Sequence, residues 1–172
     1  MFHECPKCHN KNVYPGRVLG MGCDSEVNSS PYLSIEPVKF RFTLFEKNWF
    51  ILDSKWIVCG GCGNVFTNFD YYKLANKIEK WLKGEVVSGV RSEKCGICQS
   101  PALTWKMKAK GNEPYDFWFD FCKTEWKLTF TEQSKFSVCR EVTVCGHCSV
   151  IAGCADLAEV KKKIEIFKPG SC

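Results

Sequence analysis

The chain has 172 residues, of which 45% are hydrophobic and 25% are charged, with a formal net charge of +5. This composition is typical of a globular protein and excludes a disordered chain. No apolar run approaches the roughly 18 residues of a membrane span. The unusual feature is a count of thirteen cysteines, and an odd number favours thiols that bind metal or stay free.

The opening residues, MFHECPKCHN, contain two cysteines and lack the basic and apolar segments of a secretory signal. We therefore expect a cytoplasmic protein in a reducing compartment. A zinc ion held by four thiolates contributes a charge of about −2, so two such sites would lower the total to about +1. The basic balance is weak evidence for a nucleic-acid partner.

Four cysteine pairs share the spacing C-x-x-C: Cys5/Cys8, Cys59/Cys62, Cys95/Cys98 and Cys145/Cys148. A shift of 86 residues superposes the second pair on the fourth, and residues 39–81 and 125–167 are identical at 11 of 43 positions without a gap. Self-similarity at a fixed period indicates a repeat. We interpret the chain as a tandem duplication of one unit, over residues 1–83 and 94–172, with a linker at 84–93.

Within each unit, alternating residues predict strands between the two cysteine pairs. Residues 39–45 alternate apolar and polar side chains, the period of a half-buried strand, and residues 49–58 predict a second strand that leads into Cys59. Residues 125–130 and 135–144 repeat this pattern, and residues 115–121 add another strand. The aromatic side chains could stack on nucleic-acid bases, but we expect them to form the core of a small sheet.

A helix is predicted at the end of each unit, beginning at the N-cap residues Asp70 and Asp156. Apolar residues spaced three and four apart form one face of each helix. Lysines occupy the other side, and the run at 161–163 is interpreted as a solvated face.

Each unit contains two C-x-x-C turns, enough for one tetrahedral zinc site with four thiolate ligands. We assign one zinc to Cys5, Cys8, Cys59 and Cys62 and a second to Cys95, Cys98, Cys145 and Cys148, both structural. Pairing across the two units, or across two chains, remains the alternative. His3 and His9 flank the first pair and could substitute for a ligand, but we interpret them as surface residues and His147 as a turn residue near the metal.

These cysteines and the strands that lead into them resemble the zinc-ribbon superfamily, in which two turns at the ends of β-hairpins share one metal. The resemblance implies a strand-rich α+β protein of two tandem zinc-ribbon-like units. Each unit would be a small antiparallel sheet stapled by a four-cysteine site and followed by one amphipathic helix. The spacing between the pairs is longer than in common ribbons.

The sequence CGHC at 145–148 also resembles the redox pair of a disulfide isomerase. The equivalent pair in the first unit is CGGC, and the predicted helix cap follows only at Asp156, so zinc binding is favoured. Five cysteines lie outside the pairs: Cys23, Cys122, Cys139, Cys154 and Cys172. We interpret Cys122, Cys139 and Cys154 as buried thiols, and Cys23 as the one in a context open enough for a reactive thiol.

We recognise no pattern of catalytic residues and no small-molecule site, and we expect a non-catalytic, zinc-stabilised binding module, such as an adaptor, inhibitor or regulatory protein, with a protein partner. The alternatives are a nucleic-acid-binding zinc-ribbon protein and a thiol-disulfide oxidoreductase or redox sensor that uses CGHC or Cys23. Residues 9–38 show no clear sequence similarity to residues 99–124 and are one candidate region for contacts with a partner. The cationic side chains of the predicted helices and strands are another. The candidate partner-binding residues are Arg17, Met21, Tyr32, Lys39, Arg41, Lys73, Lys77, Lys127, Lys161 and Lys162.

Overall fold

The computed structural model describes residues 2–20, 30–34, 49–82, 91–108, 117–122 and 133–169. In the first half of the chain the elements are β1 (Val13–Gly20), β2 (Tyr32–Ser34), β3 (Trp49–Ile51), β4 (Lys55–Cys59), β5 (Asn64–Asn68) and α1 (Tyr71–Leu82). In the second half they are β6 (Arg91–Lys94), β7 (Pro101–Lys108), β8 (Phe117–Phe121), β9 (Lys135–Val138), β10 (Glu141–Cys145), β11 (Val150–Cys154) and α2 (Leu157–Phe167).

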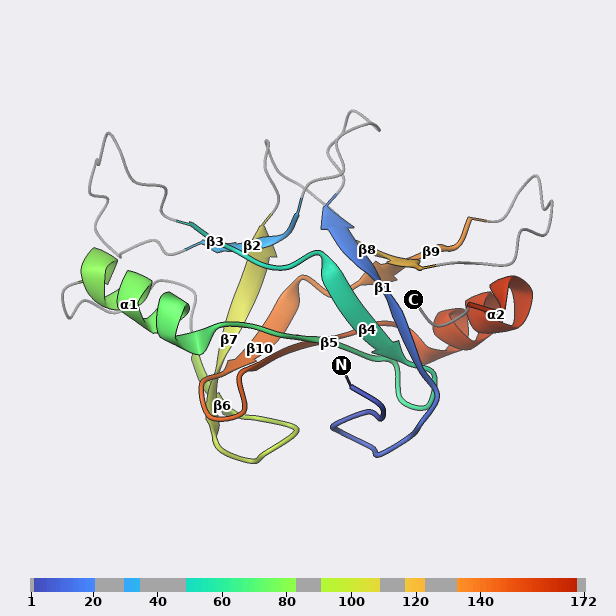
Figure 1. The fold of residues 1–172 in the computed structure, drawn as a ribbon, viewed down its shortest axis with the longest axis horizontal. Coiled ribbons are helices and arrows are strands. Elements are labelled where there is room, and N and C mark those ends of the chain that lie inside the picture. The colour runs from blue at the N-terminus through green and yellow to red at the C-terminus, as the bar shows by residue number, and fades with distance from the viewer. Residues whose placement is uncertain are drawn as a thin grey trace.

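The described strands belong to one 11-stranded antiparallel sheet. Ten of them follow the order β3-β2-β7-β10-β11-β5-β4-β1-β8-β9, and β6 pairs with the first part of β7. Figure 1 shows the sheet as one curled layer that resembles half a barrel, with a helix at each end.

The expectation of two tandem sheet units, each followed by its own helix, is therefore wrong. β2 of the first half pairs with β7 of the second, with Tyr32 opposite Lys108. β8 of the second half pairs with β1 of the first, with Gly16 opposite Phe121. Unpaired N–H and C=O groups at a strand edge favour addition of another strand, and here the two halves supply strands to each other's edges.

Equivalent strands of the two halves occupy equivalent positions in the strand order, counted outward from the centre of the sheet. β5 and β11 are central, and outward from them come β4 and β10, β1 and β7, β2 and β8, and finally β3 and β9. The central register pairs Phe66 with Ala152, two positions that the 86-residue shift superposes. β1 and β7 occupy matching places, although their sequences show no clear echo of each other.

The main core lies on one face of this sheet, toward which alternate residues of each strand point. Trp56 and Val58 of β4 are buried there, together with Phe117 and Phe119 of β8. Phe119 stacks on Phe136 of β9 at a centroid separation of 5.1 Å. The prediction that aromatic residues of the strands form a core is confirmed for Trp56, Phe117, Phe119 and Phe136, although the core belongs to one large sheet. Burial keeps these four side chains from stacking on bases.

Two strands predicted as continuous are each broken near the middle. Residues 49–58 form β3 and β4, separated by a turn in which the Asp53 carboxylate accepts a hydrogen bond from the Lys55 N–H (3.0 Å) and the Asp53 carbonyl accepts one from Trp56 Nε1 (2.7 Å). Such a side-chain bond to the backbone two residues on stabilises a turn. Residues 135–144 form β9 and β10. The strands predicted at 39–45 and 125–130 lie outside the described residues.

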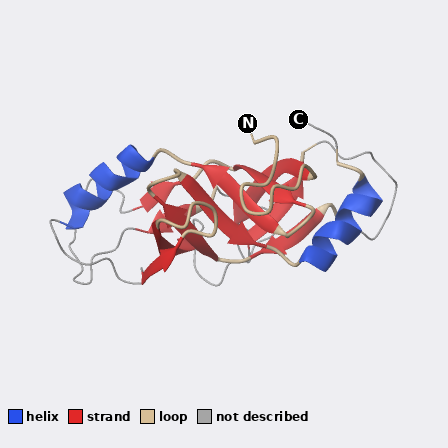
Figure 2. Ribbon diagram, turned by 90° about the horizontal axis from the view of Figure 1, so that it is seen from below, coloured by secondary structure: helices blue, strands red, loops and turns tan. Residues whose placement is uncertain are grey.

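Both helices begin where they were predicted, and Figure 2 shows them at opposite ends of the sheet. Asp156 caps α2 by accepting two N–H bonds of its first turn (2.7 and 3.2 Å), and Asp70 accepts the Lys73 N–H (3.1 Å). The equivalent residues Leu74 and Val160 are buried in the main core. Each helix therefore covers one end of the core through the apolar face that its sequence predicts.

A methyl group at Gly16 would disrupt the packing of β1 on β8. A Cβ built there lies 2.3 Å from the Phe119 ring and 2.5 Å from the Asp120 carbonyl oxygen, whereas one at Gly96 meets nothing within 4 Å. We expect Gly16→Ala to lower the free energy of unfolding by about 1–3 kcal/mol and Gly96→Ala to leave it nearly unchanged. Denaturant unfolding of the metal-loaded protein measures both; equal midpoints for the two variants would contradict this packing.

Candidate metal centres

Each C-x-x-C pair lies in a tight turn held by backbone hydrogen bonds. In the first turn the Cys5 N–H donates to the Asn10 carbonyl (2.8 Å) and the His9 N–H donates to the Cys5 carbonyl (2.9 Å). The turn at Cys95 repeats both bonds, at 2.9 and 3.0 Å. His9 and its equivalent Gln99 adopt left-handed backbone conformations, with φ of 56° and 60°. The two turns therefore share one local geometry.

The other two pairs lie in hairpins of the central sheet. Cys59 ends β4 and Cys62 precedes β5, and Cys145 and Cys148 lie in the same way between β10 and β11. The Gly63 N–H donates to the Cys59 carbonyl (2.9 Å), and Gly63 has a positive φ of 69°, a conformation that glycine adopts at little cost. These rigid hairpins place two sulfurs of each set, and the preceding turns supply the other two.

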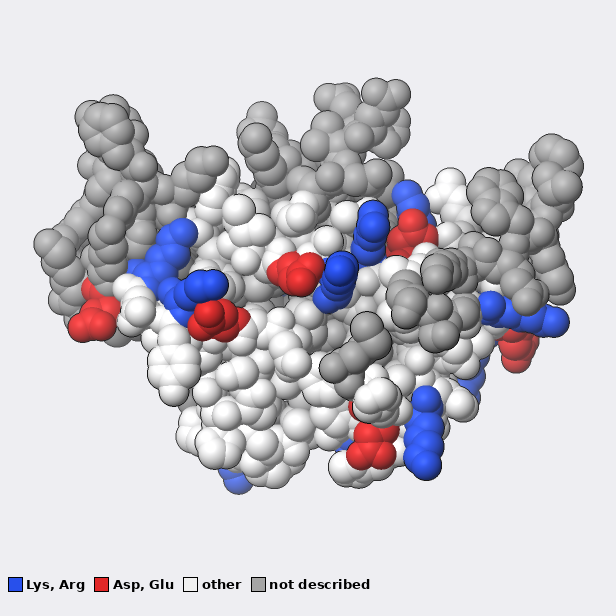
Figure 3. Space-filling model, viewed as in Figure 1, with Lys and Arg blue, Asp and Glu red and all other residues white. Residues whose placement is uncertain are grey.

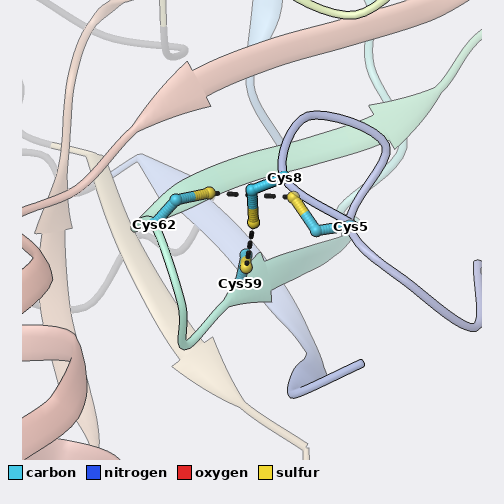
Figure 4. A group of neighbouring side chains, drawn as sticks. All are labelled: Cys5, Cys8, Cys59 and Cys62. Carbon is cyan, nitrogen blue, oxygen red and sulfur yellow. Dashed lines mark hydrogen bonds between the residues drawn. The ribbon is translucent and has the colours of Figure 1, made fainter. Parts of the chain in front are cut away.

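The four sulfurs of the first set converge on one point, as Figure 4 shows. Cys5 Sγ lies 3.7 Å from Cys62 Sγ, and Cys8 Sγ lies 3.6 Å from Cys59 Sγ. All four lie within 4.8 Å of one another. A tetrahedral zinc ion with Zn–S bonds near 2.3 Å separates its ligand sulfurs by roughly 3.8 Å. The set could hold a metal ion, and its donors and spacing fit zinc.

The second set has the same arrangement. Cys95 Sγ lies 3.8 Å from Cys148 Sγ, and Cys98 Sγ lies 3.5 Å from Cys145 Sγ. All four sulfurs again lie within 4.8 Å of one another. The four cysteines of each set come from one half of the chain. The structure therefore brings together the same two groups of cysteines that were assigned from the sequence.

Burial and hydrogen bonds shift the pKa values of the thiols within each set in opposite directions. Desolvation raises the pKa of Cys59 to about 12 and also raises the pKa of Cys62 and Cys145. A backbone hydrogen bond from Asn10 lowers the pKa of Cys8 to about 7, and hydrogen bonds from Ser100 lower that of Cys98 to about 6. Cys8 and Cys98 are thus the thiols most ready to bind metal as thiolates, whereas the desolvated thiols must lose a proton.

Apolar side chains join the two metal centres on the face of the sheet opposite the main core. Cys5 and Cys59 pack with Phe66 and Val150 in one buried cluster, and Phe2 contacts Phe66 edge-on at 5.0 Å. Cys95, Ala102 and Cys145 form a second cluster. Ile97 and Cys148 pack against both clusters. The two centres therefore share a continuous apolar contact.

No histidine belongs to either set among the described residues. His3, His9 and His147 are exposed, and His9 Nδ1 lies 3.4 Å from the Glu4 carboxylate. Their interpretation as surface or turn residues fits this placement.

The candidate partner-binding residues do not gather into one patch in the part of the chain that the structure describes. Arg17 on β1 lies in register between Lys55 and Asp120, and Tyr32 packs on Trp49 at a centroid separation of 4.9 Å. Figure 3 shows side chains of both charges interspersed on this face of the molecule.

The helix lysines among these candidates are divided between the two ends of the sheet. Lys73 lies 3.4 Å from the Asp70 carboxylate, and Lys77 Nζ donates to the Trp49 carbonyl. Lys161 and Lys162 are exposed on α2, at the other end. Met21, Lys39, Arg41 and Lys127 lie outside the described residues.

The interpretation of Cys139 and Cys154 as buried thiols is wrong. Both side chains are exposed and form a disulfide, and Cys122 is half-buried. Cys139 lies six residues before Cys145, and Cys154 lies six residues after Cys148. A hairpin centred on that pair brings such positions opposite each other, a signal that the sequence analysis missed. Cys23 and Cys172 lie outside the described residues.

Neither described helix combines the length and the apolar character needed to cross a membrane. Comparison with protein-family models, with curated proteins and with solved structures gives no match. The resemblance to zinc ribbons thus rests on the two four-cysteine groups.

Metal binding at the first centre should be strongly pH-dependent. With its pKa raised to about 12, the Cys59 sulfur is protonated at neutral pH, and the metal must displace that proton. Acidification therefore weakens binding, by roughly tenfold per pH unit for each proton displaced. Competition with a chelator between about pH 8 and about pH 6 measures this slope. Affinity independent of pH would show that the four sulfurs are already ionised.

The shared apolar contact predicts that the two centres influence each other. We expect Cys98→Ser, which removes a half-buried ligand of the second set, to weaken metal binding at the first set by about 5–150-fold, the range of typical coupling free energies. Chelator competition with this variant measures the effect. Cys122→Ser, outside both sets, is the matched control. Unchanged affinity at the first centre of Cys98→Ser would show that the centres are independent.

Proposed function

We propose that this chain is a zinc-stabilised protein-binding module without catalytic activity, and that its two zinc ions are structural. Four thiolates complete a tetrahedral zinc shell and leave no position for water or substrate. The sulfur spacings of 3.5–3.8 Å support such closed sites. The function is therefore sought on the surface of the protein.

The observation that carries the proposal is an apolar surface around the start of α1. Within the described residues, four large hydrophobic side chains are exposed: Ile51, Tyr71, Tyr72 and Leu103. Ile51 lines a hollow of about 610 Å³ with Phe69 and Asp70, next to the start of α1. Tyr71 and Leu103 line another of about 270 Å³. Tyr72, 80% exposed, contacts Tyr71 at a centroid separation of 6.3 Å.

The opposite end of the sheet provides an internal comparison. The 86-residue shift places Ser137 at the position of Ile51 and Ala158 at the position of Tyr72. The two ends share a strand arrangement, so the fold by itself does not require exposed apolar residues beside α1. Exposed apolar side chains that gather in one region are typical of sites that bind other proteins, and we name this set of four residues the α1 surface.

The charges near the α1 surface favour a protein over a nucleic acid. Lys73 lies 3.4 Å from the Asp70 carboxylate, and Lys77 Nζ is engaged by the Trp49 carbonyl. Recognition of nucleic acid depends on cations that contact successive phosphates, and these two lysines already have partners within the chain. The partner we propose is a folded protein that presents an apolar contact to the α1 surface.

Photo-crosslinking at matched positions tests this proposal. A photoreactive amino acid at position 72 should crosslink the partner, whereas the same group at the equivalent position 158 should not. Reconstitution with the purified partner should then show weaker binding for Tyr72→Ala and unchanged binding for Lys161→Ala. Because 80% of Tyr72 is exposed, this substitution should leave the fold intact.

The salt dependence of binding separates the alternatives. An apolar contact predicts an affinity that changes little between about 50 and about 200 mM salt, whereas phosphate contacts predict a steep fall. Equal crosslinking from positions 72 and 158 would contradict the α1 surface as the binding site. Binding of an oligonucleotide that Lys161→Ala weakens and Tyr72→Ala does not would favour the nucleic-acid alternative.

A further inference from the structure

A disulfide outside both metal sets joins two neighbouring segments of the sheet. The Cα atoms of Cys139 and Cys154 lie 5.5 Å apart, within the ordinary range for disulfides. The Cys139 N–H donates to the Cys154 carbonyl (2.9 Å), and the adjacent residues Val138 and Ala155 form a β-bridge. The disulfide therefore ties the end of β9 to the end of β11, immediately before α2.

The disulfide is accessible from solvent. Both half-cystines are exposed, and both line an open hollow of about 760 Å³. Attack by a thiolate requires access to a disulfide sulfur, and the hollow provides it.

The charged groups of the hollow carry a small positive excess. Three cations, Lys106, Lys108 and Arg140, line it together with two carboxylates, those of Glu93 and Glu141. Lys106 and Glu141 form an ion pair at 4.0 Å. One positive charge in excess favours the thiolate that is released when the disulfide opens.

The other half of the sheet builds the equivalent corner without a disulfide. The 86-residue shift places Asp53 at the position of Cys139 and Asn68 at the position of Cys154. The Val18 N–H donates to the Ser54 carbonyl (2.9 Å), and the equivalent bond from Met107 to Arg140 measures 2.8 Å. This backbone bond is common to both sides, so the part of the corner that it holds forms in the first half without a disulfide.

We propose that Cys139 and Cys154 form a reversible thiol–disulfide exchange site whose reducing partner is a dithiol. One thiolate of the dithiol attacks a sulfur of the disulfide, forms a mixed disulfide and releases the other cysteine as a thiolate, which takes up a proton. The second thiol of the dithiol then attacks the mixed disulfide and frees the first cysteine. Two electrons pass to the protein, and the dithiol leaves as a cyclic or intramolecular disulfide.

Opening the disulfide acts on the edge of the sheet next to α2. In the reduced state, the isolated bridge at Val138 and the Cys139 N–H bond remain to hold β9 against the end of β11. Local opening occurs where few bonds hold a segment. β9 itself stays paired with β8, so reduction is expected to increase hydrogen exchange at Cys139, whose N–H donates to the Cys154 carbonyl, and in the first turn of α2, without loss of metal.

The experiment is a redox titration of the zinc-loaded full chain in buffers of reduced and oxidised dithiothreitol. Alkylation followed by mass spectrometry counts the thiols, and a chromogenic chelator reports released zinc. We expect a cross-linked peptide that contains Cys139 and Cys154, and a single two-electron transition that yields two further alkylated cysteines while both zinc ions stay bound. Hydrogen exchange of the two end states should change at the predicted segments.

The double variant Cys139→Asp/Cys154→Asn carries the residues of the other half and is the matched control. It should fold, keep both zinc ions and lose the redox transition. The proposal is overturned if no cross-linked peptide forms under oxidising conditions, or if the disulfide in the folded protein resists excess dithiothreitol. It is also overturned if zinc release accompanies the transition, since the metal-site thiolates would then be the redox groups. None of these outcomes bears on the α1 surface.

Discussion

The pairing of β5 with β11 is the interaction that makes the two halves of this chain one body. Its ladder runs from Val150 opposite Asn68 to Cys154 opposite Asn64. With these strands side by side, the outer strands of each half reach the edge of the other, and the backbone groups that would be exposed at the edges of two small sheets are paired across one large sheet. The main core, both helix positions and the proximity of the metal centres all follow from this arrangement.

The two cysteine sets lie on the face of the sheet that the main core and the helices do not cover. On the face opposite the main core, buried apolar residues form small clusters around the cysteines, with Phe66 and Ile97 among them. Desolvation opposes ionisation of Cys59 and Cys145, so a metal ion is needed to stabilise their thiolates in this position. Structural zinc contributes about 10–16 kcal/mol, which is comparable to the whole net stability of a domain. A bound zinc ion would therefore add a strong link between the first and third turns and the sheet.

The two halves keep the scaffold and differ on the surface. Beside α1 the chain exposes Ile51 and Tyr72, whereas the equivalent positions beside α2 are Ser137 and Ala158. Beside β11 the chain carries the disulfide between Cys139 and Cys154, where the first half has polar residues without sulfur. Positions shared by the two halves serve packing, so the surface positions at which the halves differ are where partner binding and redox chemistry are proposed.

The sequence by itself determined the features that depend on local spacing. C-x-x-C turns fix two sulfurs each, an aspartate begins each helix, and alternation marks the aromatic strands, so the two cysteine sets, both helices and the burial of residues such as Phe119 were predicted. Only the tertiary structure decided which strands pair, because hydrogen bonds between strand edges carry no residue-specific signal. For that reason two separate sheets were expected, whereas the structure has one sheet in which strands of one half pair with edge strands of the other. The disulfide between Cys139 and Cys154 was not predicted, although the equal spacing of these residues from the CGHC turn would have placed them opposite each other in a hairpin.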